Sequence, residues 1–268
     1  MSSIKGMYSD IINFLSGNGR WHIVMLEAYL DESGTHKGAP VLCVAGYWGN
    51  RQQWGAFEKE WFPKIEGSPH SFFHAENSKC DQLRLPLAEA IDKGKLKGII
   101  CSTKPGTFNY SASEQLKSQM GDAYAVCAVT CAWIICQWSY DNKKESVSFA
   151  YETGRPNADF VNKALIAQQR LNDPEVNIAN VSMVKKEECP HIATADFLSH
   201  VYGSTNADDI AWYDYLVRNG NILYTEITSD KLNEMSKLIK DHYINQRRWK
   251  ELKRIMRRQE EGLKPNDF

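Results

Sequence analysis

The sequence predicts an α/β fold in which a mixed sheet is flanked by helices. Two apolar segments come first, 24–30 and 40–47, and the Ser33-Gly34 turn between them indicates neighbouring strands. Short apolar runs then alternate with stretches of helical periodicity, which is the pattern of α/β proteins. At 268 residues the chain is long enough for one large domain with additions.

The order of these patterns places the later elements. Further strands are expected at 71–75, 96–103, 147–151 and 181–184. Helices are expected at 50–62, 81–93, 118–140, 157–171 and 190–202, with Asn50 as the N-cap of the first. Residues 203–224 show no regular pattern. We therefore divide the chain into an N-terminal helical segment at 1–20, a main domain at 21–228 and a basic helical extension at 229–268.

Several classes of protein are disfavoured by what the sequence lacks. It contains no G-x-x-x-x-G-K-[ST] phosphate loop, no G-x-S-x-G nucleophile motif and no zinc-type spacing of Cys and His. The seven cysteines form no C-x-x-C pair, which suits a reducing, cytoplasmic setting. No signal peptide is expected, and the apolar run 123–138 is too short to span a bilayer. We expect no membrane partner, and the oligomeric state is open.

Carboxylates stand where an α/β fold concentrates its chemistry. Asp31 and Glu32 follow the first strand, Glu152 follows a later strand, and Asp196 lies in the first turns of a helix that also carries His200. Clustered carboxylates stay ionised only beside a cation, and an all-oxygen donor set favours Mg²⁺ or Mn²⁺. Two such ions about 4 Å apart stabilise the attacking and leaving oxygens of a phosphodiester. We therefore expect Asp31, Glu152 and Asp196 to be metal ligands, and these three together with Glu32 and His200 to be the catalytic residues.

Each of these residues also has a plainer interpretation. Asp31 is a turn former, and Glu32 points to the opposite face of its strand because side chains alternate. Glu152 is equally suited to a surface turn, and the charge of Asp196 is favourable at a helix N-terminus. His200 orients Asp196, reaches the scissile phosphate, or is a satisfied core histidine. Two secondary candidates on the substrate side follow the expected strand at 71–75, namely His74 and Glu76.

The first strand resembles the start of a bacterial and archaeal family, domain-of-unknown-function family 3800. The family carries an Asp-Glu pair near its N-terminus, which Asp31-Glu32 matches, and a Gln-x-x-Asp motif, which Asp196 matches in its Asp only. Ala193 stands at the Gln position, and Phe73-His74-Ala75 is also similar to the family. The resemblance covers about residues 24–203. It implies a ribonuclease H-like fold and a metal-dependent nuclease acting on RNA or DNA.

A different function is also compatible with this resemblance. The chain could keep the fold as a non-catalytic protein that binds nucleic acid or a partner, in phage defence or a toxin–antitoxin system. Metal-dependent turnover favours the nuclease. Salt-sensitive binding without turnover favours the binding protein.

A strongly basic segment closes the sequence. Residues 237–258 contain nine Lys or Arg and two acidic residues, so they carry +7 and the remainder carries −8. Trp249, Leu252, Ile255 and Met256 recur at helical spacing within it. We expect this segment to contact a phosphate backbone through Arg247, Arg248, Arg254 and Arg257. The alternatives are a membrane-surface helix, a partner-binding helix, and a docked terminal helix with a solvated basic face.

Reversing the charge of these four arginines distinguishes contact with a phosphate backbone from a docked structural helix. Each phosphate neutralised by a protein cation releases counterions, so the log of the affinity falls with log salt by about 0.9 per duplex contact. The fourfold Arg→Glu variant is expected to flatten this slope, measured by fluorescence anisotropy on labelled RNA and DNA. An unchanged slope would leave the segment a structural helix, and Trp249→Ala would then lower the melting temperature.

Overall fold

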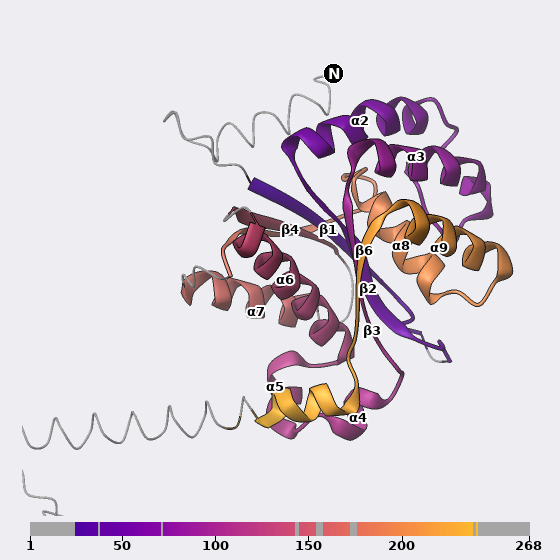
Figure 1. Cartoon of the computed structure of the whole chain (residues 1–268). Coiled ribbons are helices and arrows are strands. Elements are labelled where there is room, and N and C mark those ends of the chain that lie inside the picture. The colour runs from indigo at the N-terminus through magenta and orange to yellow at the C-terminus, as the bar shows by residue number, and fades with distance from the viewer. Residues whose placement is uncertain are drawn as a thin grey trace, which may run out of the picture.

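Six strands of the described chain form one mixed sheet, with the order β5-β4-β1-β2-β3-β6 (Figure 1). The computed structural model describes residues 25–36, 38–70, 72–142, 145–153, 158–171, 176–237 and 240. The strands are β1 (Met25–Ser33), β2 (Leu42–Asn50), β3 (Lys97–Thr103), β4 (Ser146–Glu152), β5 (Ile178–Val184) and β6 (Asn221–Glu226). β1, β2 and β3 form an antiparallel meander, whereas β4, β5 and β6 join by parallel pairing. This arrangement confirms the α/β class and is consistent with a ribonuclease H-like fold.

Helices cover both faces of this sheet (Figure 1). The helical elements with defined bounds are α2 (Arg51–Glu66), η1 (Ser78–Leu83), α3 (Arg84–Gly94), α4 (Thr107–Ser111), α5 (Glu114–Met120), α6 (Ala123–Asn142), α7 (Ala158–Leu171), α8 (Ile192–Gly203) and α9 (Ala207–Asn219). α6 and α7 lie on one face, and α2, α3, α8 and α9 lie on the other.

Alternation along the central strands divides the core between these faces. Val44 of β2 packs with α6, whereas its neighbours Cys43 and Ala45 pack with α8 and α2. In β1, Leu30 faces α6, so the next residue, Asp31, faces α8. The alternation thus delivers the two acids at the end of β1 to opposite faces of the sheet.

α6 is the central helix of the first face. Its 20 residues meet the length and hydropathy criteria of a membrane span, so the expectation that the segment is too short was wrong. In this structure, however, α6 packs on β2 and β3, with ten of its residues buried. Half of its residues are therefore core residues of the protein, while Trp133 stays 54 % exposed.

Two expectations about local structure were wrong. Residues 72–76 form turns and not a strand, because the backbone groups of Ala75 bond to the side chains of Asp196 and Arg84. Residues 203–224 are regular and contain α9 and β6. The apolar periodicity of this segment is weak because few of its side chains are buried. α9 buries little besides Asp209 and Leu216, and β6 is a largely exposed edge strand. The N-cap at Asn50 is present, with a capping box to Gln53.

The expected terminal segments lie mostly outside the described residues. This holds for the helical pattern at 1–20 and for the basic positions Arg247, Arg248, Arg254 and Arg257. Residues 229–237 are helical, as expected. Within them Leu232 is fully buried in the α6 core, and the Ser236 hydroxyl accepts a hydrogen bond from the Ser113 N–H.

A buried histidine ties the start of α8 to α2 and β1. The His191 ring stacks on Tyr29 at 4.9 Å between centroids and lies 3.0 Å from a carboxylate oxygen of Glu58. Burial works against a protonated ring, but Cys189 and Glu58 outweigh it and raise the pKa of His191 to about 9. The protonated ring therefore helps to hold α8, and with it Asp196, against the sheet.

The raised pKa predicts a pH-dependent contribution of this pair to stability. A histidine whose folded pKa exceeds its ordinary 6.5 adds stability that is complete below pH 6.5 and is lost as the pH rises through about 9. Glu58→Gln is therefore expected to lower the melting temperature at about pH 6 more than at about pH 10. Glu60→Gln, an exposed position on the same helix, is the control. An equal loss at both values would show that Glu58 acts through packing alone.

Candidate functional site

Strand pairing brings Asp31 and Glu152 together. β1 lies in the middle of the sheet and runs parallel to β4, with Leu30 opposite Tyr151. The next residue along each strand is the acid, so both carboxylates stand at the carboxyl ends of neighbouring parallel strands. This is the edge at which ligands collect in α/β sheets.

α8 contributes the third carboxylate from above the sheet. Asp196 is 5 % exposed, and its Oδ2 accepts a hydrogen bond from the Ala75 N–H at 2.7 Å. The same oxygen lies 3.6 Å from His74 Nδ1. The 72–77 loop thus orients Asp196, and His74, whose side chain is 39 % exposed, lies between this acid and solvent.

A lysine joins the three acids at one point. The Lys186 ammonium lies 2.7 Å from Asp196 Oδ1, 3.3 Å from Asp31 Oδ2 and 3.4 Å from Glu152 Oε2. Its side chain is 7 % exposed. The sequence interpretation missed Lys186 because Lys185–Glu188 resembles a solvated run of charges. The position of Lys186 just after β5 could have identified it, because Asp31 and Glu152 were selected for standing at the ends of strands.

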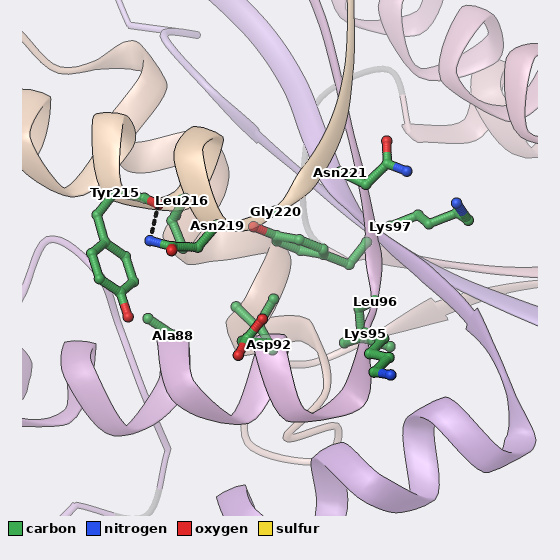
Figure 2. A pocket seen from close by; sticks show the side chains of 12 residues that line it. Ala88, Asp92, Lys95, Leu96, Lys97, Tyr215, Leu216, Asn219, Gly220 and Asn221 are labelled. Carbon is green, nitrogen blue, oxygen red and sulfur yellow. Dashed lines mark hydrogen bonds between the residues drawn. The ribbon is translucent and has the colours of Figure 1, made fainter.

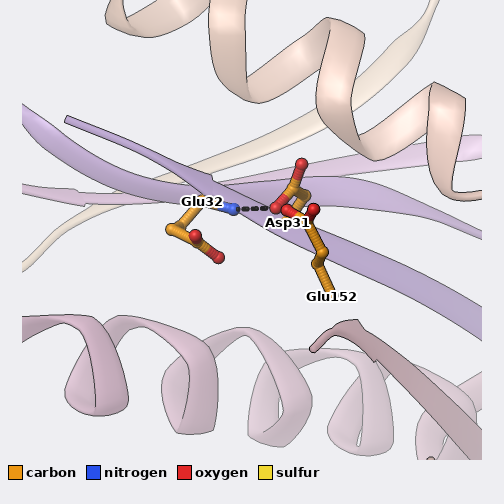
Figure 3. Close-up of side chains that lie close together, drawn as sticks. All are labelled: Asp31, Glu32 and Glu152. Atoms are coloured by element: carbon orange, nitrogen blue, oxygen red, sulfur yellow. Dashed lines mark hydrogen bonds between the residues drawn. The ribbon is translucent and has the colours of Figure 1, made fainter. Parts of the chain in front are cut away.

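Glu32 is also close to the cluster, although it leaves β1 on the other face. Figure 3 shows Asp31 directed toward α8 and Glu32 toward α6, with Glu152 beside Asp31. One carboxylate oxygen from each of the three acids lies within 4.8 Å of the other two. The Glu32 N–H donates to Asp31 Oδ1 at 2.8 Å, which fixes the orientation of that carboxylate.

His200 belongs to a neighbouring network. Its Nε2 lies 3.3 Å from Asp209 Oδ2, and Asp209 also accepts a hydrogen bond from Arg84 at 2.6 Å. Of the three interpretations of His200, the structure therefore contradicts the one in which it orients Asp196, because the ring pairs with Asp209. These residues line a cleft of about 520 Å³ that Glu76 borders as well.

A second pocket lies far from the acids. It measures about 250 Å³ and is bordered by the end of α3, the end of α9 and the first residues of β3 and β6 (Figure 2). Lys97 and Asn221 mark the amino ends of those two strands. Because β3 runs in the same direction as β1, this pocket is at the opposite end of the sheet from Asp31.

Burial and like charges set the ionisation of the site. Burial, followed by the charge of Glu32, raises the pKa of Asp31 well above its ordinary value, although Lys186 opposes the rise. Burial also acts against ionised Asp196, but the contacts with His74 and Lys186 prevail and lower its pKa. Burial disfavours the Lys186 ammonium, yet Asp31, Asp196 and Glu152 together raise its pKa. Lys186 therefore stays charged, and the cluster remains short of positive charge.

The donor set suits a hard divalent cation. Every candidate ligand is a carboxylate oxygen, and their separation of up to 4.8 Å is compatible with ions that bind oxygen at about 2.0–2.6 Å. Asp31 Oδ2 is buried, and its charged neighbour among the described residues is the Lys186 ammonium at 3.3 Å. One ammonium leaves this group of carboxylates short of positive charge, so the residues present fit a bound divalent cation.

Comparison with known proteins adds little to this geometry. No family model matches the chain, and no curated protein matches it. The resemblance to family 3800 therefore stays a prediction. One similar solved structure is the PCNA:RNase HII complex from Archaeoglobus fulgidus, at a TM-score of 0.39 and 15 % identity over 74 % of this chain and 91 % of that one.

The opposite pKa shifts of Asp31 and Asp196 predict opposite effects of amide substitution. A raised folded pKa means that ionised Asp31 destabilises the fold at neutral pH, so Asp31→Asn is expected to raise the metal-free melting temperature by about 2–4 °C. A lowered folded pKa means that ionised Asp196 adds stability at pH values above its ordinary pKa. This stability is lost as the pH falls. Asp196→Asn is therefore expected to lower the melting temperature at pH 7.

Melting both variants in EDTA tests these signs. The parent protein in the same buffer is the reference. A lower melting temperature for Asp31→Asn would assign that residue to the turn after β1 and not to a repulsive cluster.

Proposed function

We propose that this protein is a divalent-metal-dependent nuclease that hydrolyses phosphodiester bonds in RNA or DNA. One observation carries the proposal: three carboxylates from β1, β4 and α8 converge on a single point at the carboxyl edge of the sheet. Burying these charges together is costly for folding, and a functional need for a cation explains the cost. The resemblance of Asp31-Glu32 to family 3800 supports the same activity.

The chain's own residues have distinct parts in this proposal. Asp31, Glu152 and Asp196 would hold Mg²⁺ or Mn²⁺, with Glu32 at the rim. The metal, when bound, supplies a water of lowered pKa and a Lewis acid for the phosphate. His74 is half-exposed beside Asp196, whose carboxylate 3.6 Å away raises the pKa of the ring. A protonated His74 would donate a hydrogen bond to the phosphate of the substrate.

Nucleic acid is the proposed partner, with two regions of the chain in contact with it. The acidic edge of the sheet would receive the scissile phosphate. Arg247, Arg248, Arg254 and Arg257 would contact the backbone elsewhere, which offsets the repulsion between an acidic body and a polyanion. A cytoplasmic location is part of the same proposal, since its seven cysteines are unpaired.

A non-catalytic role remains the second candidate, and Lys186 is the observation that favours it. An ammonium held by three carboxylates resembles an internal ion-pair network that serves folding alone. In that case the fold would bind nucleic acid or a protein partner without turnover. The two candidates differ in whether cleavage depends on a metal.

Cleavage assays on defined substrates test the proposal. Labelled single- and double-stranded RNA and DNA are incubated with the parent protein and Mg²⁺, Mn²⁺ or EDTA. We expect cleavage with metal only and a loss of at least about 100-fold in Asp31→Asn, because an amide holds a divalent ion less tightly than a carboxylate. Glu114→Gln, which alters a carboxylate that is 90 % exposed and pairs with Lys117, is the matched control.

The contrary outcomes are also defined. Metal-independent cleavage, or cleavage by Asp31→Asn at the parent's rate, would remove the carboxylate cluster from the mechanism. Salt-sensitive binding with no cleavage of any substrate would select the non-catalytic role.

A further inference from the structure

The position of Lys186 suggests how many metal ions the site can hold. Its ammonium already bridges Asp31, Glu152 and Asp196, each within 3.4 Å. This is the place that one ion of a two-ion site would take if it were shared by these acids. One oxygen each from Asp31, Glu32 and Glu152 also lies within 4.8 Å of the other two, and Glu32 leaves β1 on the opposite face from Asp31 (Figure 3).

We infer that Lys186 is a built-in second cation, so that the site binds one divalent ion through Asp31, Glu32 and Glu152 and uses the lysine in place of another. The inference rests on the proposed metal-dependent function and specifies it. It makes Lys186 a positioning residue. The ammonium fixes the carboxylates of Asp196 and Asp31 in the positions that they take beside the bound ion. The inference also assigns to Glu32 the role of a ligand.

The charges at the site agree with a single ion. Asp31, Glu32, Glu152 and Asp196 carry four negative charges when ionised, and Lys186 returns one positive charge. One divalent ion would leave a single negative charge, which the neighbouring His74 offsets when protonated. A second divalent ion would bring two more positive charges against the ammonium, at a distance where like charges repel strongly in a buried site.

The surroundings of Lys186 keep its ammonium in place. The following turn is closed by hydrogen bonds from the Glu188 and Cys189 N–H groups to the Lys185 carbonyl. The adjacent cavity holds about 10 Å³ and is lined mostly by apolar residues such as Phe73 and Ile192. That space is too small and too apolar to accept a retracted ammonium. A second ion would therefore have to expel a charged group that this cavity does not accommodate.

The number of Mn²⁺ ions bound per chain tests this inference directly. Isothermal titration with Mn²⁺ alone gives the stoichiometry, and electron paramagnetic resonance detects the coupling between two adjacent Mn²⁺ ions. We expect one ion per parent chain and two coupled ions per chain in Lys186→Met, since the bridging position is then vacated. Lys185→Met should keep one ion, because Lys185 is 62 % exposed and pairs only with Glu188 among the described residues.

The outcomes separate this inference from the proposed function. Two ions in the parent would show that Lys186 is displaced on binding, and one ion in Lys186→Met would show that it does not occupy an ion position. Either result overturns the inference and leaves the nuclease proposal standing. No Mn²⁺ binding by the parent would overturn both. If Lys186→Met fails to fold, Lys186→Arg provides the second variant: it keeps the charge and should bind one ion, and two ions would refute the inference.

Discussion

A buried cluster of charges is the constraint on which the rest of this structure depends. Three acids from distant parts of the chain approach one ammonium, and the side chains of Asp31, Asp196 and Lys186 are almost inaccessible to water. Such a group is stable only when its geometry is held firmly, because each unpaired buried charge is costly. The helices on the α8 side supply this firmness. The aromatic packing around His191 anchors the start of α8, and the 72–77 loop orients Asp196 through backbone and imidazole contacts.

The sheet topology gives the cluster its shape. A parallel neighbour places Glu152 beside Asp31 at the same edge, which an antiparallel strand in that position would not do. Alternation along β1 then directs Asp31 to α8 and Glu32 to α6. The adjacent acids of the sequence therefore have different surroundings. Asp31 lies 3.3 Å from the Lys186 ammonium, whereas Glu32 is directed toward α6.

Much of the fold could be predicted from the sequence, and the failures have physical causes. The strands β1, β2, β3 and β4 were evident because they are apolar runs in the core. The edge strand β6 and the helix α9 were missed because they bury few residues and so carry little periodicity. The segment at 72–76 has the composition of a strand. Its backbone groups at Ala75 are nevertheless satisfied by side chains from α8 and α3.

The sequence by itself determined the kind of chemistry available, because carboxylates at the ends of strands can be recognised from local pattern alone. The tertiary structure alone decided which charges meet. It paired His200 with Asp209 and placed Lys186 among the acids. Contacts of this kind join residues that are 9 to 155 positions apart. They follow from strand order and helix packing, which no local run of residues encodes.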